Sequence, residues 1–317
     1  MCLFPKLIVN RKYSGTIKNK GNPPALTDER VRYVPVACGN CLECRKAKAN
    51  EWRIRLHEEI KVNNFAYFIT LSFSNKSLLE LSEKGNTNNL NAIATKGIRL
   101  FLERIRKKYK KSLKHWLITE LGQNNTERIH LHGIIFSDFE INNNWLQNYW
   151  KYGHSDTGQF CNAKTINYIV KYLYKIDTKH KDYKPIILCS KGIGKSYINE
   201  FTKQKHKYKN EDTKEFYTLP NGQKLNLPIY YRNKFYSEEE REKLWIQKIE
   251  KDTRYINGIK IENVLNDEKS SKYFFNVLKQ QQKINIEIGF GDDSNEWKKK
   301  DYNLTLKMLK KSKIANH

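Results

Sequence analysis

Two short apolar segments joined by a polar connection constrain the fold of this chain more than any other feature. Residues 116–121 (WLITEL) and 128–136 (RIHLHGIIF) are rich in β-branched, aromatic and other apolar residues, and residues 122–127 between them are polar. Such runs are typical of strands, and a short polar connection favours an antiparallel hairpin. The sequence therefore predicts a sheet built around this hairpin.

The segments on either side of the hairpin define the fold class. Residues 65–73 (FAYFITLSF) have the composition of a further strand, while residues 45–61, 94–108 and 165–175 have apolar residues at helical spacing. The order strand, helix, strand, strand, helix predicts an α+β domain, with a central antiparallel sheet and flanking helices.

The two ends of the chain have a different character from this centre. Residues 1–33 lack periodicity and are interpreted as loop, while Ser237 and Glu240 form a capping box that predicts a helix to about residue 251. Asn257-Gly258 predicts a two-residue hairpin turn, and the tail from Trp297 is lysine-rich. We divide the chain into a Cys-rich N-terminal arm with a basic helix (1–62), a core (63–200) and a C-terminal extension with helix, hairpin and basic tail (201–317).

The charge balance indicates the class of partner. The chain has 59 Lys and Arg against 34 Asp and Glu, a formal net charge of +25, which is typical of a protein that binds a polyanion. A generally basic, solubilising surface is the alternative. There is neither a secretory segment nor an apolar run of membrane-spanning length, so we expect a soluble, intracellular protein that binds nucleic acid.

The hairpin carries a candidate metal site. His130 and His132 are two residues apart on a predicted strand and therefore point to the same face. Glu120 lies across the hairpin and could supply a third ligand for Mg²⁺ or Mn²⁺, with the histidines favouring tolerance of Mn²⁺. The alternative is a pair of histidines that are only solvated or hydrogen-bonded.

The helix predicted over residues 165–175 carries candidate nucleophiles. Tyr168, Lys171, Tyr172 and Lys175 are three and four residues apart and share one helical face. A phenol is a weak nucleophile at neutral pH and needs a metal or nearby cations. Attack on a DNA phosphodiester would give a phosphotyrosine and a free 3′-hydroxyl. The alternative is that both tyrosines pack in the core.

A cysteine cluster precedes the core. Cys38, Cys41 and Cys44 form a C-x₂-C-x₂-C pattern that is one ligand short of a tetrahedral zinc site. Cys2 is the preferred fourth ligand and His57 the alternative. We predict a structural Zn²⁺ that fastens the N-terminal arm, with free thiols or an iron–sulfur cluster as the other interpretations.

A glycine-rich segment invites an ATPase interpretation that the spacing excludes. Gly194-Lys195-Ser196 matches the end of a P-loop, but position 189 is Cys where that motif requires Gly. The segment is interpreted as a plain loop or as a turn that binds DNA phosphate through backbone amides.

Three of these segments together resemble a known superfamily. Residues 68–72 (FITLS), 120–136 (ELGQNNTERIHLHGIIF) and 168–175 (YIVKYLYK) are similar, in order and spacing, to the three motifs of HUH rolling-circle replication initiators. The pair of tyrosines looks like the microvirus form, and residues 38–44 (CGNCLEC) with the helix after them are similar to gokushovirus-like initiators.

The resemblance implies a ferredoxin- or RRM-like palm and a role for each motif residue. His130 and His132 would bind the metal with Glu120, Tyr168 and Tyr172 would alternate as nucleophiles, and Lys171 and Lys175 would steady the phosphate or the phenolate. The implied partners are single-stranded DNA at a replication origin and host helicase and polymerase, in the cytoplasm of the host cell. Two rivals stay open: a non-enzymatic, zinc-stabilised nucleic-acid-binding regulator, and a single-tyrosine relaxase or transposase.

Overall fold

The chain forms two compact units in a computed structural model that describes residues 1–122, 127–177 and 179–291. We call residues Ala49–Thr202 and Tyr217–Pro228 the sheet unit. The end unit contains Met1–Lys48, Lys203–Phe216 and the described residues from Ile229 onward. Most of the N-terminal arm and of the C-terminal extension, which the sequence treats as separate parts, therefore packs together in the end unit. The predicted basic tail lies outside the described residues.

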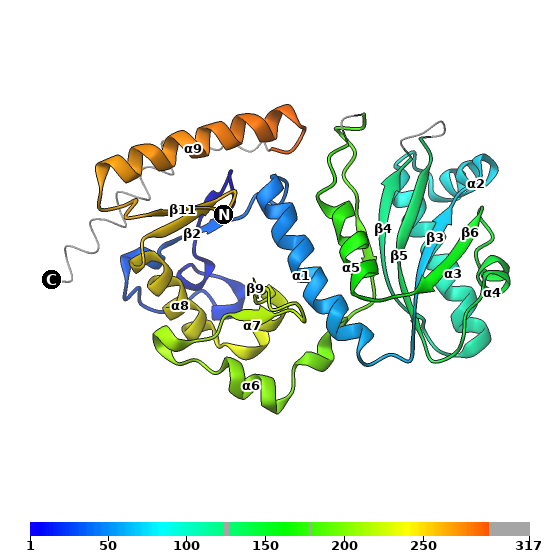
Figure 1. The fold of residues 1–317 in the computed structure, drawn as a ribbon, viewed down its shortest axis with the longest axis horizontal. Helices are drawn as coiled ribbons and strands as arrows, with labels where there is room; N and C mark the ends of the chain where they lie inside the picture. The colour runs from blue at the N-terminus through cyan, green and yellow to red at the C-terminus, as the bar shows by residue number, and fades with distance from the viewer. Residues whose placement is uncertain (123–126, 178, 292–317) are drawn as a thin grey trace. The chain divides into compact units, whose positions relative to one another are not determined.

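The sheet unit contains a five-stranded sheet in which every pair of neighbours is antiparallel, in the order β6-β3-β5-β4-β7 (Figure 1). Its strands are β3 (Phe65–Ser72), β4 (Lys114–Leu121), β5 (Ile129–Ser137), β6 (Ser155–Phe160) and β7 (Ile187–Cys189). The predicted hairpin is β4 and β5, and the mixed class with a central antiparallel sheet is confirmed.

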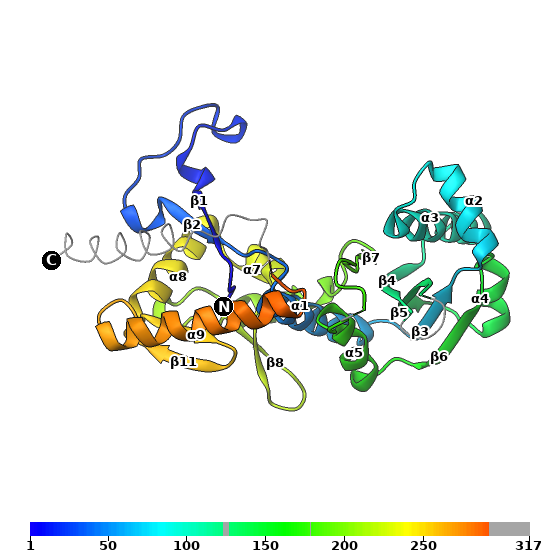
Figure 2. The ribbon, with the colours of Figure 1, turned by 90° about the horizontal axis from the view of Figure 1, so that it is seen from above.

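Helices cover both faces of this sheet. They are α1 (Leu42–Ile60), α2 (Asn75–Gly85), α3 (Leu90–Tyr109), α4 (Asn143–Tyr149) and α5 (Ala163–Val170). Figure 2 shows α2 and α3 on one side of the strands and α5 on the other. Alternate strand residues supply two cores: Ile69, Leu117 and Leu131 pack toward α3, whereas Trp116, Ile118 and Ile134 pack toward α1 and α5. The sheet is thus buried on both faces.

The end unit is built from short elements at both ends of the chain. Strands β1 (Lys6–Val9) and β2 (Tyr33–Val36) pair with each other, and β10 (Thr253–Ile256) pairs with β11 (Ile259–Glu262). The helices are α7 (Ile229–Phe235), α8 (Glu238–Glu250) and α9 (Glu268–Glu287). Helix α6 (Glu200–His206) and strand β8 (Phe216–Thr218) cross the boundary between the units, and β9 (Lys224–Asn226) pairs with β8.

Several sequence predictions hold and several are corrected. The capping box of Ser237 and Glu240 and the hairpin turn at Asn257 and Gly258, both with positive φ, are confirmed. The first 33 residues are not all loop, because residues 6–9 find a strand partner in residues 33–36. The helix predicted over 165–175 ends as an α-helix at Val170 and continues as the 3₁₀ turn Lys171–Leu173, a tightening that is frequent at helix C-termini.

Candidate active site

The predicted metal ligands lie together on the face of the sheet that α5 covers. Glu120 on β4 is the register partner of His130 on β5, and His132 is two residues further along the same strand. Residues at this spacing point to one face, so all three side chains leave the sheet on the same side. One atom from each lies within 4.8 Å of the others. The antiparallel register therefore assembles the group.

Glu120 stands at the centre of this group. Its Oε2 is 3.2 Å from His130 Nε2 and 3.3 Å from His132 Nε2, while its Oε1 is 2.5 Å from Lys175 Nζ. Burial by itself raises the pKa of Glu120, but hydrogen bonds to both histidines and to Lys175 outweigh burial and hold the pKa below its usual range. The carboxylate is therefore ionised, with one oxygen facing the histidines and the other facing a cation.

Each histidine is oriented through its other ring nitrogen. His130 Nδ1 is 3.2 Å from the carbonyl oxygen of Arg128, and His132 Nδ1 is 3.1 Å from the hydroxyl of Thr70 on β3. A carbonyl oxygen only accepts hydrogen bonds, so it favours the tautomer of His130 with the proton on Nδ1. In the neutral ring, Nε2 then has a free lone pair directed toward Glu120.

The three atoms fit a divalent cation. Adjacent ligands of an octahedral ion with bonds of about 2.1 Å are about 3.0 Å apart, close to the observed 3.2 and 3.3 Å separations. Two imidazoles and one carboxylate leave further coordination positions for water or substrate, and the mixed nitrogen and oxygen donors suit Mn²⁺ as well as Mg²⁺. The group is therefore a candidate open metal site.

Both tyrosines lie beside this group. The Tyr172 ring stacks on His132 with centroids 4.9 Å apart and an interplanar angle of 13°. The Tyr172 hydroxyl donates to the Tyr168 hydroxyl over 2.6 Å, and Tyr168 is 50% exposed. Burial, the bond to Tyr168 and the charge of Glu120 all raise the pKa of Tyr172, so this phenol is protonated. The two phenol oxygens thus share one location next to the histidines.

Local sequence explains how the tyrosines are positioned. The side chain of Asn162 caps the first turn of α5, with Thr165 completing a capping box. Ile166, Ile169 and Val170 are buried against the sheet, which leaves position 168 facing outward. The tyrosines were thus predicted on the correct segment, although Tyr172 belongs to the 3₁₀ turn.

The two candidate lysines differ in their surroundings. Lys175 pairs with Glu120 and its Nζ lies 5.6 Å from the centroid of the Tyr172 ring. Lys171 is exposed at the C-cap of α5 and makes no ion pair with a described residue. Lys175 is therefore part of the assembled group, whereas Lys171 stands at its edge.

Two neighbours of the site did not emerge as site residues from the sequence. Thr70 holds His132, and the ring of Phe68 is parallel to that of His132 at a centroid distance of 5.9 Å. Phe68 also contacts Tyr168 edge to face. Both belong to the strand segment FITLS, but their roles follow from the pairing of β3 with β5, which the order of strands along the chain does not determine.

The glycine-rich segment turns toward a protein carboxylate. The backbone N–H of Gly194 donates to Glu59 Oε2 over 2.7 Å. Glu59 is buried and also pairs with Lys114. An anion is thus bound at this turn, and that anion is a side chain of the chain itself.

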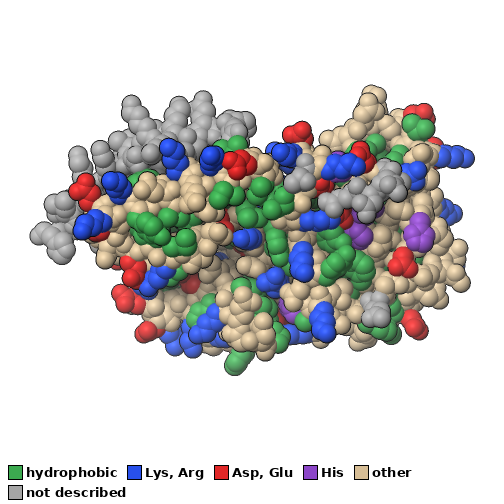
Figure 3. All heavy atoms as spheres, turned by 45° about the horizontal axis from the view of Figure 1, so that its top comes forward, with side chains coloured by type: hydrophobic (Ala, Val, Ile, Leu, Met, Phe, Trp, Pro, Cys, Tyr) green, Lys and Arg blue, Asp and Glu red, His purple; other side chains and the backbone are tan. Residues whose placement is uncertain are grey.

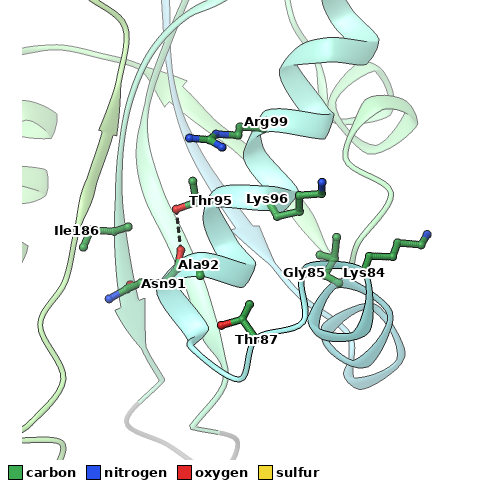
Figure 4. A pocket seen from close by; sticks show the side chains of 10 residues that line it. Lys84, Gly85, Thr87, Asn91, Ala92, Thr95, Lys96, Arg99 and Ile186 are labelled. Carbon is green, nitrogen blue, oxygen red and sulfur yellow. Dashed lines mark hydrogen bonds between the residues drawn. The ribbon is translucent and has the colours of Figure 1, made fainter.

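The metal group lies on an open surface. A cavity of about 630 Å³ lies elsewhere in the sheet unit, and its lining includes Lys84 of α2 and Lys96 and Arg99 of α3 (Figure 4). Its lining belongs mainly to the helices on the opposite face from α5. In Figure 3, lysine and arginine side chains are distributed over the visible surface of the sheet unit, and histidine side chains reach the surface among them. Such an exposed site suits a long polymeric substrate.

The four predicted zinc ligands also come together. Cys2, Cys38, Cys41 and Cys44 form a second group whose sulfur atoms lie within 4.8 Å of one another. Of the two candidates for the fourth position, the structure places Cys2 there, and His57 is not a member of the group.

Comparison with known proteins yields a consistent class. A family described as replication-associated protein ORF2 matches residues 66–177, the range that contains the histidines, Glu120 and both tyrosines. The chain is 24% identical over 239 residues to replication-associated protein VP4 of Bdellovibrio phage phiMH2K, covering 66% of this chain and 70% of that protein. It is 26% identical over 286 residues to replication-associated protein ORF2 of Spiroplasma virus 4, covering 77% and 86%.

These matches define what the chain is similar to: replication-associated proteins of bacterial viruses. No solved structure matches the chain significantly. Among the described residues, no helix has the length and apolar character needed to cross a membrane.

Proposed function

We propose that this protein initiates rolling-circle replication of a phage genome as a two-tyrosine HUH endonuclease. In this role it nicks single-stranded DNA at the origin, stays attached to the 5′ end and later rejoins the strand. The single observation that carries the proposal is the stacking of Tyr172 on His132, with the Tyr168 hydroxyl 2.6 Å from that of Tyr172. Two nucleophile candidates thus adjoin a candidate metal site.

The residues have distinct roles in the proposed reaction. His130, His132 and the Oε2 atom of Glu120 would bind Mg²⁺ or Mn²⁺. When bound, the cation supplies positive charge that polarises the scissile phosphate. Lys175 holds Glu120 in place through Oε1 and adds a second positive charge near the phosphate. Lys171, at the edge of the group, would contact the phosphates of the flanking strand.

The cleavage step is a transesterification. A phenol oxygen forms a bond to phosphorus while the bond from phosphorus to the 3′ oxygen breaks. The phenol loses its proton and the departing 3′ oxygen gains one, so charge and atoms balance without a further reactant. The product is a 5′-phosphotyrosine and a free 3′-hydroxyl.

The proximity of the two hydroxyls favours alternation between the tyrosines. The first tyrosine would hold the 5′ end during one round of synthesis, and the second would cut the regenerated origin. The displaced 3′-hydroxyl would then attack the first phosphotyrosine and close a unit-length circle. In the host cytoplasm, strand separation and synthesis would come from host helicase and polymerase.

A covalent adduct is the direct test of the proposal. The full chain would be incubated with Mn²⁺ and single-stranded oligonucleotides that tile the DNA molecule carrying its gene, followed by denaturing electrophoresis. We expect a protein–DNA adduct that disappears with EDTA and in His130→Ala. The matched control His154→Ala changes an exposed histidine outside the group and should retain the adduct. Binding without an adduct would instead favour a non-enzymatic nucleic-acid-binding regulator.

Tyrosine variants separate the two-tyrosine mechanism from a single-tyrosine one. We expect Tyr168→Phe and Tyr172→Phe each to impair the cycle of cleavage and rejoining, and the double variant to form no adduct. Tyr174→Phe changes a neighbouring half-buried tyrosine and serves as the control. A silent effect of one substitution, with loss of both steps in the other, would establish a single nucleophile.

A further inference from the structure

The four-cysteine group in the end unit has the dimensions of a site for one metal ion. Cys2 belongs to the chain terminus, Cys38 and Cys41 to the loop before α1, and Cys44 to the first turn of α1. All four sulfur atoms lie within 4.8 Å of one another, and those of Cys38 and Cys44 are 3.9 Å apart. All four are free thiols. A disulfide would require about 2.05 Å between sulfurs.

The sulfur separations distinguish between kinds of metal centre. In a tetrahedral site with metal–sulfur bonds of about 2.3 Å, the ligands are about 3.8 Å apart, which agrees with the 3.9 Å separation of Cys38 and Cys44. An iron–sulfur cluster places several iron and sulfide atoms between its cysteines and spreads them further. The upper limit of 4.8 Å for the whole group thus favours a single ion.

The surroundings stabilise negative charge on the sulfurs. Backbone N–H groups donate to three of them: Cys38 N to Cys2 over 3.2 Å, Cys41 N to Cys38 over 3.3 Å, and Leu3 N to Cys41 over 3.5 Å. Hydrogen bonds of this kind orient metal-bound thiolates and tune their charge. The guanidinium of Arg45 also interacts electrostatically with Cys38 and Cys41. Four uncompensated thiolates would repel one another, so these contacts suit thiolates that share a cation.

We propose that Cys2, Cys38, Cys41 and Cys44 bind one structural Zn²⁺. Four protein ligands close the tetrahedral coordination shell and leave no position for substrate, which is the mark of a structural rather than a catalytic zinc. The proposal uses none of the residues of the nicking site and stands whether or not the protein nicks DNA.

The zinc would join the two ends of the chain within the end unit. Leu3, Phe4 and Cys41 share a core with Ile256, Ile261 and Phe274 of the C-terminal elements. Figures 1 and 2 both place the N-terminus beside α9 and β11. The side chain of Gln282 on α9 donates to the Leu3 carbonyl, and the N–H of Leu42 donates to the side chain of Asn285. The metal would therefore order the surface on which α9 and the β10–β11 hairpin pack.

The first test is the metal content of the full-length protein. The chain would be purified under reducing conditions without added metal and analysed by mass spectrometry for zinc and iron. We expect about one zinc per chain, retained in His130→Ala and in the control variants Cys161→Ser and Cys189→Ser. Zinc should be lost in Cys41→Ser and retained in Cys2→His, because histidine is also a zinc ligand. Stoichiometric iron, or zinc content that does not respond to Cys41→Ser, would overturn the proposal.

A second test keeps the proposal falsifiable if Cys41→Ser does not fold. Zinc would be removed from the wild-type chain with a chelator and replaced by Co²⁺, which should give the absorption bands of a tetrahedral cobalt thiolate. Hydrogen exchange should increase in α9 and β10–β11 after zinc removal and stay unchanged in β3, β4 and β5. Equal protection of α9 with and without the metal would contradict the structural role.

Discussion

Replacement of Thr70 by valine should weaken metal binding without removing a metal ligand. The Thr70 hydroxyl is 3.1 Å from His132 Nδ1, and the His132 side chain is only 13% exposed. Valine keeps the β-branched shape that suits a strand but leaves the imidazole nitrogen without this partner. An unsatisfied, largely buried polar group costs about 1–3 kcal/mol. That energy corresponds to about a 5- to 150-fold loss of affinity.

Second partners of metal-bound histidines have similar measured effects, about 10- to 100-fold in metal affinity or activity. We therefore expect the Mn²⁺ concentration for half-maximal adduct formation to rise in Thr70→Val by about 10- to 100-fold. The rate at saturating Mn²⁺ should recover, because Thr70 orients His132 and does not contact either tyrosine hydroxyl.

The assay is a titration of adduct formation with Mn²⁺ under single-turnover conditions. Thr70→Ser retains the hydroxyl and should bind Mn²⁺ like the wild type. Thr95→Val removes a hydroxyl from α3, where it donates to a backbone carbonyl, and serves as the matched control. An unchanged Mn²⁺ requirement in Thr70→Val, or a defect that saturating Mn²⁺ does not restore, would refute the reasoning.

Three further predictions follow from the structure. Lys175→Met should slow single-turnover cleavage more than Lys171→Met, because only Lys175 is paired with the metal-site carboxylate; equal effects would contradict this. Gly133→Ala should lower the free energy of unfolding by about 1–3 kcal/mol or more in urea, because a Cβ would lie 2.1 Å from the carbonyl oxygen of Trp116, whereas an unchanged midpoint would contradict the strand register. Burial lowers the pKa of His115, so the unfolded state takes up the proton first and stability is lost as pH falls below about 6.5; in urea unfolding measured across this range, His115→Gln should have a shallower pH dependence than wild type.

The sequence was sufficient where local pattern and chemistry coincide. The β4–β5 hairpin was predictable because the alternation of side chains and the short connection determine its register, and that register places Glu120 opposite His130. The tyrosine face of α5 was predictable because the buried isoleucines follow helical spacing. Residues 123–126 of the predicted turn lie outside the described part of the chain.

The features that were missed depend on contacts between segments distant in sequence. Strand β6 has the polar sequence SDTGQF and is a strand because it pairs with β3 at the edge of the sheet. Thr70 acts on His132 through a partner 62 residues away. Helix α2 was interpreted as loop because of its polar composition, yet Ser74 caps it and Leu81 is buried against the core.

Mapping the covalent linkage tests the central claim most directly. After reaction with origin DNA and Mn²⁺, the adduct would be digested with nuclease and protease, and the modified peptide would be sequenced by mass spectrometry. The account predicts a nucleotide joined through its 5′ phosphate to Tyr168 or Tyr172, with a free 3′-hydroxyl on the released strand. A linkage to any other residue, or cleaved DNA with a 5′ phosphate that is bound to no protein, would contradict it.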